Sequence, residues 1–304
     1  MDAWIPITIA AAFFQNLRSA LQKHLKGRLS TAGAGYARFL YAWPFALVYV
    51  WGLNALGGLG WPTPSWIFLA YCLAGGITQI LFTVLLIHLF SFRNFAVGTT
   101  FSKLELVMVA VLGAAILGDA LGPVAILAIV ISAAGVMCLT MDEANITVRR
   151  LLAGLAETPT LIGLLCAACL GASVVFFRGG ALSLGHHSLV MAAGYTFAVS
   201  VVLQTVIMGA WLRWREPGQL TRVIREWRWA GQVGVVGAIA SVCWFTAFTL
   251  QNAAYVRALG QVELVFTFAS SVLLFRERVS RWEVIGIVLV VGAILLLLLA
   301  GRRI

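Results

Sequence analysis

The sequence predicts an all-α membrane protein whose ten transmembrane helices form two inverted five-helix repeats. Of its 304 residues, 62% are hydrophobic and only 11% are charged, which is too little charge to cover a soluble domain of this size. Apolar runs of membrane-spanning length recur along the chain. They lack the alternation of apolar and polar residues that the strands of a membrane barrel require. One long apolar segment also occurs in two copies.

The apolar runs place ten predicted helices along the chain. They cover residues 4–22, 36–56, 66–90, 95–117, 121–140, 158–178, 188–212, 230–252, 256–275 and 281–300. The longest polar connection, at 141–157, separates five helices from five. Because five is odd, the second half enters the membrane in the opposite sense to the first. We therefore expect a first repeat at 1–140, a linker at 141–157 and an inverted second repeat at 158–304.

The repeated segment carries a carboxylate within an apolar helix in each copy. Both copies contain Glu-Leu-Val, beginning at Glu105 and at Glu263, and both have a second carboxylate fourteen residues later, at Asp119 and Glu277. A charged carboxylate inside the bilayer faces a cavity, finds a partner or takes up a proton. We expect Glu105 and Glu263 to contact substrate or carry a coupling proton; the alternative is a structural hydrogen bond that clamps the halves. For Asp119 and Glu277 we expect a capping role at the next helix.

The ends of the two halves resemble the ten-helix, EamA-type branch of the drug/metabolite transporter superfamily. That family has Glu-Pro in the fourth helix of each half, and Gly-Glu about a dozen residues later. The matching dipeptides here are Glu105-Leu106, Gly118-Asp119, Glu263-Leu264 and Arg276-Glu277. Arg38 resembles an arginine near the start of the family's second helix. The resemblance implies proton-linked or facilitated movement of small metabolites, amino acids or drugs. Since leucine replaces both prolines, we expect the family's helix irregularity at that point to be absent.

Cationic residues near the repeated carboxylates are further candidates for a substrate site. Lys103 lies two residues before Glu105, and Gln261 takes the matching place in the second copy. Helix positions two apart point about 200° away from each other, so Lys103 and Glu105 face different ways. Lys103 would suit a substrate that bears a carboxylate. For Arg18, near a basic loop, the alternative is a side chain that extends to the membrane surface.

One arginine, one histidine and three aromatic residues within the predicted helices complete the candidate site. Arg38 could pair with a carboxylate or bind a lipid phosphate. His88 is either a hydrogen-bonded packing residue or part of a proton relay. Tyr41, Trp43 and Trp244 lie deeper than the other aromatic residues and line a substrate pocket or pack in the core.

The distribution of basic residues predicts the orientation of the chain. Fourteen lie in connections after odd-numbered helices: Lys23, Lys26, Arg28, Arg93, Arg149, Arg150, Arg213, Arg215, Arg222, Arg225, Arg228, Arg276, Arg278 and Arg281. Four lie on the other side: Arg178, Arg257, Arg302 and Arg303. The positive-inside rule then puts residues 23–28 and 213–228 in the cytoplasm and both termini outside. The family is usually drawn with both termini in the cytoplasm.

The function that these features favour is secondary transport. Catalytic and phosphate-binding motifs are lacking, which argues against an enzyme, and the net charge of +10 lies in loops that meet lipid headgroups rather than nucleic acid. The five cysteines lie in apolar helices and indicate packing, with no metal or cofactor expected. We expect an exporter of small molecules in a bacterial inner membrane, as a monomer or homodimer. Nutrient uptake or exchange, a lipid-linked headgroup flippase and a membrane scaffold are the alternatives.

Overall fold

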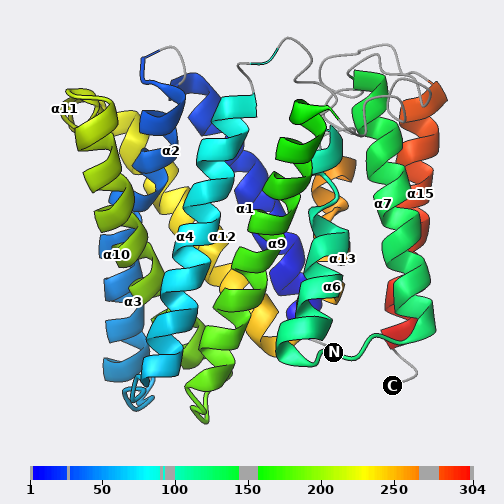
Figure 1. The fold of residues 1–304 in the computed structure, drawn as a ribbon. Helices are drawn as coiled ribbons and strands as arrows, with labels where there is room; N and C mark the ends of the chain where they lie inside the picture. The colour runs from blue at the N-terminus through cyan, green and yellow to red at the C-terminus, as the bar shows by residue number, and fades with distance from the viewer. Residues whose placement is uncertain are drawn as a thin grey trace. The chain divides into compact units, whose positions relative to one another are not determined.

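The regular structure of the chain is helical. The computed structural model describes residues 3–25, 28–89, 92, 100–143, 157–266 and 281–301, and no strand occurs in these ranges (Figure 1). The helices are α1 (Trp4–Leu25), α2 (Thr31–Leu40), α3 (Trp43–Ala55), α4 (Trp66–Leu89), α6 (Glu105–Leu117), α7 (Pro123–Glu143), α9 (Thr158–Ser183), α10 (Leu189–Arg215), α11 (Gln219–Arg225), α12 (Trp227–Leu250), α13 (Ala253–Gly260) and α15 (Arg281–Gly301). The predicted all-helical class is confirmed.

Six helical stretches are long and apolar enough to cross a membrane within the described residues. They are Trp66–Leu86, Thr100–Leu117, Thr158–Ser183, Leu189–Arg215, Trp227–Leu250 and Arg281–Leu299. At least one helix also lies in each of the ten predicted ranges. The count of ten crossings and the inverted arrangement of the repeats stay predictions.

The second predicted helix, 36–56, is wrong as a single element. The chain forms α2 and α3 there, with a turn at Tyr41 and Ala42 between them. Pro44 lies in the first turn of α3. Backbone N–H groups in the first turn have no partner within the helix, so the missing N–H of proline costs no hydrogen bond there. In an uninterrupted helix the same proline would remove a bond to the preceding turn. Proline therefore starts α3 and divides this segment.

The helices that carry the Glu-Leu-Val motifs are interrupted just before the motif in both copies. A turn at Lys103 and Leu104 precedes α6, and a turn at Gln261 follows α13 before helix resumes at 262–266. The N–H of Lys103 donates to Thr100 O (3.1 Å), and the N–H of Gln261 donates to Ala258 O (3.3 Å). Both are tight bonds between residues three apart. The expectation that the irregularity is absent was wrong, because these tight turns form without proline. Residues 95–99 and 267–275 of the predicted helices lie outside the described residues.

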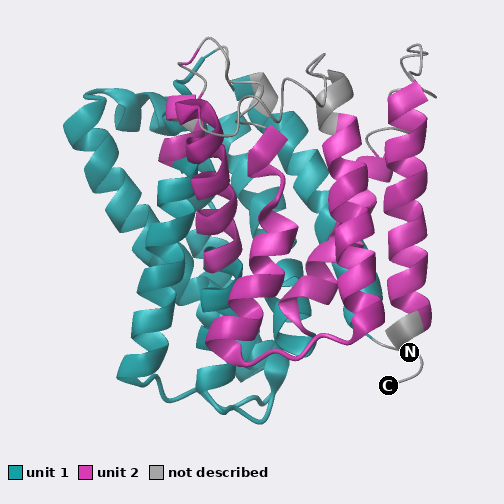
Figure 2. Cartoon of the chain, turned by 45° about the vertical axis from the view of Figure 1, so that its right-hand side comes forward, with its two compact units in different colours: residues 1–83, 173–251 teal, residues 84–172, 252–304 magenta. Residues whose placement is uncertain are grey.

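The chain divides into two compact units, and each takes segments from both halves of the sequence (Figure 2). Unit 1 comprises residues 1–83 and 173–251, and unit 2 comprises residues 84–172 and 252–304. Helices α4 and α9 contribute residues to both units. The predicted repeats are divisions of the sequence, so each repeat supplies helices to both units.

In unit 1, α12 packs along α1 and also contacts α2, α3 and α10. Gly234 of α12 allows the turn between α2 and α3 to approach closely: a Cβ on Gly234 would lie only 2.3 Å from Tyr41 Cβ. At the other end of α12, Arg178 donates to the carbonyl oxygens of Phe248 (2.6 Å) and Gln251. This arginine satisfies carbonyl groups that the end of a helix leaves without partners.

The two predicted cytoplasmic segments meet at one end of unit 1. Arg28 Nη1 lies 3.0 Å from Glu226 Oε2, and the Ser30 hydroxyl donates to Glu216 Oε2. Ser30 also caps α2 by accepting from the Gly33 N–H. Residues 28–30 and 216–226 therefore share a side of this unit, as the distribution of basic residues predicted.

In unit 2, the last helices of the two sequence halves, α7 and α15, pack against each other. They touch at glycines: a Cβ on Gly135 would lie 2.8 Å from Gly286 O, and a Cβ on Gly286 would lie 2.9 Å from Gly135 O. Small residues at such contacts let membrane helices approach closely. The faces turned away from this contact carry exposed apolar residues such as Val130 and Val288, as lipid-facing helices do.

Candidate functional site

A buried ion pair in unit 2 links the first Glu-Leu-Val motif to α13. Glu105 is the first residue of α6, and its side chain is 11% exposed. Arg257 lies on α13, is 14% exposed and donates through Nη2 to Glu105 Oε1. The amino-terminal end of α6 also favours a negative charge at Glu105, because unpaired backbone N–H groups gather there. The first repeated carboxylate is thus held by a full opposite charge and a helix end.

Both partners of this pair lie beside the helix interruptions. Glu105 directly follows the turn at Lys103 and Leu104, and Gln261 forms the turn that ends α13. The Gln261 side chain donates to the backbone oxygen of Arg257, at 3.5 Å. Predicted residues Glu105 and Gln261 are therefore brought to one region, with Arg257 between them.

The other predicted residues of unit 2 differ in how far they are buried. Lys103 is exposed whereas Glu105 is buried, so the two face different ways, as their spacing predicted. Glu263 is half-buried in the helical segment 262–266. His88 is exposed near the end of α4 and packs edge-on against Phe92, with ring centres 5.1 Å apart.

The capping role expected for Asp119 stays a prediction. Asp119 follows Gly118, whose left-handed conformation (φ 68°) ends α6, and the N–H of Asp119 donates to Gly113 O. It is therefore part of the end of α6, and Gly122 is the residue before Pro123 of α7. Glu277 lies outside the described residues.

A second charged arrangement lies in unit 1 around Gly237 of α12. A Cβ on Gly237 would lie 3.2 Å from Arg18 Cδ and 4.0 Å from Arg38 Cβ. Arg18 comes from α1, and Arg38 from the last turn of α2. Three helices therefore bring two arginine side chains to one glycine.

The aromatic candidates of unit 1 have different surroundings. Trp244 is 7% exposed and donates through Nε1 to Gln15 Oε1 at 2.9 Å, and its ring stacks on Phe248. The Tyr41 hydroxyl donates to Val223 O (3.2 Å), which ties the end of α2 to α11. Trp43, at the start of α3, is exposed. Tyr41 and Trp244 thus hold helices together through their polar atoms.

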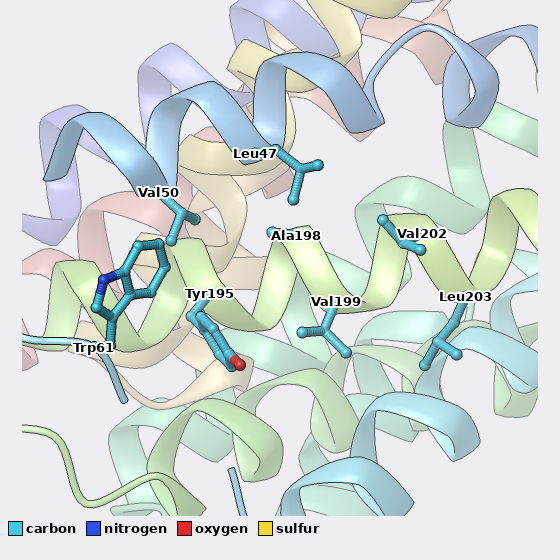
Figure 3. Close-up of a pocket in the computed structure, with 8 residues that line it drawn as sticks. All are labelled: Leu47, Val50, Trp61, Tyr195, Ala198, Val199, Val202 and Leu203. Atoms are coloured by element: carbon cyan, nitrogen blue, oxygen red, sulfur yellow. The ribbon is translucent and has the colours of Figure 1, made fainter. Parts of the chain in front are cut away.

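An apolar cavity of about 300 Å³ lies between α3, α10 and Trp61 in unit 1 (Figure 3). Its lining residues are Leu47, Val50, Trp61, Tyr195, Ala198, Val199, Val202 and Leu203. None of these eight carries a charge, and none is a predicted site residue. This cavity therefore suits apolar groups such as hydrocarbon chains and is separate from both arrangements of charges.

Comparison with known protein families gives one match. Residues 158–299 match the model of the EamA-like transporter family. The chain carries an EamA-like transporter domain. The match supports the resemblance to the drug/metabolite transporter superfamily that the motifs predicted, and the matched family is one of membrane transporters rather than of enzymes.

A solved structure titled "Crystal structure of protein" has the same fold. It superposes with a TM-score of 0.72 at 15% sequence identity, and the match covers 100% of this chain and 98% of that chain. At this identity the likeness concerns the fold alone. A comparison with curated proteins gave no match.

The EamA-like domain supplies one side of each charged arrangement. Arg257 and Gly237 lie inside residues 158–299, whereas Glu105, Arg18 and Arg38 precede the domain. Each arrangement therefore depends on both halves of the chain within a single unit.

Arg257 is the site residue that sequence reasoning missed. It was counted among the basic residues of the loops, because it lies near the end of an apolar run. Its place six residues before Glu263, with Thr99 at the equivalent position before Glu105, was the available signal. A charge present in only one copy of a repeat marks a position where the copies have diverged in role.

Proposed function

We propose that this EamA-like protein is a secondary transporter that exports small metabolites, amino acids or drugs, with transport coupled to protons at Glu105. The buried pair of Glu105 and Arg257 beside the helix interruptions is the observation that carries the proposal. In this proposal the two sequence repeats exchange roles between inward-open and outward-open states.

The interruptions support transport because they occur at matching places in the two copies. Interrupted helices in corresponding positions of two halves are a sign of a binding site in secondary transporters. Backbone groups freed at such a break are tolerated in a membrane where they are buried in protein or face water. The tight turns at Lys103 and Gln261 are interruptions of this kind, at matching places in the two copies.

The ion pair supports coupling because binding of one proton to Glu105 would break it. Ionised Glu105 holds Arg257 in place, and a buried arginine that loses its partner is costly. Protonation of the Glu105 carboxylate removes its negative charge and frees Arg257 to bind another anionic group or to move. A proton and a conformational change are thereby linked at one contact.

Replacing Glu105 with Gln tests the coupling. The variant keeps the shape of the side chain and its capacity for hydrogen bonds but cannot exchange a proton. In proteoliposomes screened with a substrate panel, we expect gradient-driven transport to fall to the rate measured without a pH gradient, while counterflow exchange persists.

The matched control is Glu226→Gln, which alters a partly exposed ion pair with Arg28. Such pairs contribute little, so this variant should keep full gradient-driven transport. Full pH-driven transport by Glu105→Gln would rule out the coupling role. Loss of both gradient-driven transport and exchange would indicate the structural clamp instead.

A further inference from the structure

The apolar cavity of unit 1 runs along one face of α10. Five of its lining residues follow the three- and four-residue spacing of a single helix face: Tyr195, Ala198, Val199, Val202 and Leu203. This stripe extends for roughly 12 Å from its first residue to its last, at 1.5 Å per residue. Figure 3 shows the five side chains in a row, with Trp61 near one end. The cavity is therefore elongated along the helix.

The helices α3 and α10 touch at one place, and the cavity begins beside it. A Cβ on Gly194 of α10 would lie 2.9 Å from Tyr49 Cε1 of α3, so the glycine allows a close approach there. The next residue, Tyr195, already lines the cavity. On α3, Val50 is buried at its floor and Leu47 is exposed at its rim. The space thus opens from a buried floor to the surface.

The end of the cavity beside Trp61 is held in place by hydrogen bonds. Asn54 Nδ2 donates to Leu59 O at 2.7 Å, and His186 Nε2 lies 2.9 Å from Gly60 O. These contacts fix the two residues directly before Trp61, whose side chain stays exposed. Tryptophan at the end of a membrane-spanning helix lies at the level of the lipid headgroups. We therefore expect this end of the cavity to face headgroups and the rest to face hydrocarbon.

The surroundings of the cavity favour a lipid chain over a dissolved molecule. Helix α10 is long and apolar enough to cross a membrane. The rim at Leu47 continues into exposed apolar residues of the same two helices, Val48, Trp51 and Val206, a surface of the kind that lipid covers. Sites for small solutes contain a few placed polar groups that fix orientation, whereas none of the eight lining residues carries a charge.

We infer that one acyl chain of a bilayer phospholipid occupies this cavity, with the headgroup beside Trp61 and the end of the chain near Leu203. Burial of methylene groups against the stripe of α10 drives the binding. The chain fills the space that α3 and α10 leave beside their contact at Gly194. This site shares no residue with the pair of Glu105 and Arg257, so it does not depend on the proposed transport function.

Photo-crosslinking to the full chain in nanodiscs tests both the site and its orientation. The probe is phosphatidylcholine with a diazirine either at the end of one acyl chain or next to its ester, and the labelled peptides are mapped by mass spectrometry. We expect the terminal diazirine to label Val202 and Leu203, and the diazirine near the ester to label Trp61 and Tyr195. The reverse order, or labelling no stronger than at the outward-facing Val206, would overturn the inference.

Variants that fill the cavity test the same site in detergent by native mass spectrometry. Dioleoylphosphatidylcholine should stay bound, whereas dibutyrylphosphatidylcholine, with the same headgroup and short chains, should not. Val202→Trp should weaken binding about tenfold or more, because each methylene group that loses its apolar contact weakens binding severalfold. The matched control Val206→Trp, one turn further along α10 and exposed, should bind as the wild type does.

The same comparison on α3 uses Leu47→Trp with Val48→Trp as its control, so a folding defect in one pair does not decide the outcome. Equal binding of the two lipids would indicate a headgroup site and contradict the inference. So would wild-type binding by both Val202→Trp and Leu47→Trp.

A transported molecule is the other possible occupant. Compounds from the transport panel are added to the crosslinking reaction, and we expect the lipid label to be unchanged. Loss of the label with a compound that is also transported would assign the cavity to the substrate instead of lipid. Glu105→Gln should keep the label whatever its effect on transport, so failure of the coupling and failure of the lipid site are distinguishable.

Discussion

Charged side chains within the helices of this protein are accommodated in different ways. Glu105 is paired with an opposite charge on Arg257. Arg178 donates to two carbonyl oxygens at the end of α12. Arg18 and Arg38 both pack against Gly237 of α12.

The pair of Glu105 and Arg257 predicts a specific pattern of stability. Arg257→Met leaves the Glu105 carboxylate buried without its partner and should destabilise the protein by about 3 kcal/mol or more. The double variant Arg257→Met with Glu105→Gln removes both charges and should recover most of that loss. Thermal unfolding in detergent, followed for both single variants and the double variant, measures the coupling between the two sites.

The pairing would be contradicted if the loss of stability in the double variant equalled the sum of the losses in the two single variants. Arg222→Met, on exposed α11, controls for the change of an arginine as such and should shift the free energy of unfolding by less than about 0.5 kcal/mol.

At the scale of helices, the fold depends on where they break and where they touch. The turns at Lys103 and Gln261 interrupt equivalent helices, and Pro44 starts α3 in the middle of a predicted one. Close contacts are made through glycine: Gly234 on the α2–α3 turn, and Gly135 with Gly286 between α7 and α15. Breaks provide polar backbone inside a membrane protein, and glycine contacts hold the helices around them.

The glycine contact of α7 and α15 gives a prediction with an internal control. Gly286→Leu would force a side chain into Leu139 and Gly135 O, which lie 2.6 and 2.9 Å from a Cβ there. The expected cost is about 1–3 kcal/mol, as for other overpacked contacts. Gly292→Leu, on the same helix with nothing within 4 Å, should change the thermal midpoint little. Similar midpoints for the two variants would argue against close packing of α7 on α15.

For the whole molecule, the two compact units each combine segments from both sequence halves. Cutting the chain between its repeats would therefore separate α1 from α12 in unit 1 and α7 from α15 in unit 2. The interleaving explains how Glu105 reaches an arginine 152 residues away. It also means that neither repeat contains a complete unit.

The predicted orientation can be measured directly. In a cysteine-free background, with Cys72, Cys138, Cys166, Cys169 and Cys243 replaced, one cysteine is added after Ile304. The fourteen-to-four distribution of basic residues predicts that a membrane-impermeant thiol reagent labels it in intact cells. A cysteine at the exposed position Arg222 should be protected. The reverse pattern would place both termini in the cytoplasm.

Composition and periodicity were sufficient for the class of the protein. Hydrophobicity is a local property of the chain, so apolar runs predicted helices in each of the ten ranges, and the all-helical membrane class followed. Short motifs predicted the family in the same way, because Glu105, Gly118 and Asp119 keep their spacing along the chain. The segment Tyr41–Pro44 contained a signal for a break that the hydrophobic run around it concealed.

Only the tertiary structure decided which charges meet. Arg257 lies in the sequence near the end of an apolar run, and nothing within several residues of it indicates Glu105. Arg18, Arg38 and Gly237 come from three helices, and their meeting depends on how α1, α2 and α12 pack. Likewise, the turns at Lys103 and Gln261 formed although leucine replaces proline. A side chain's propensity acts on its own turn of helix, whereas the pairing of charges is settled by partners far away in the chain.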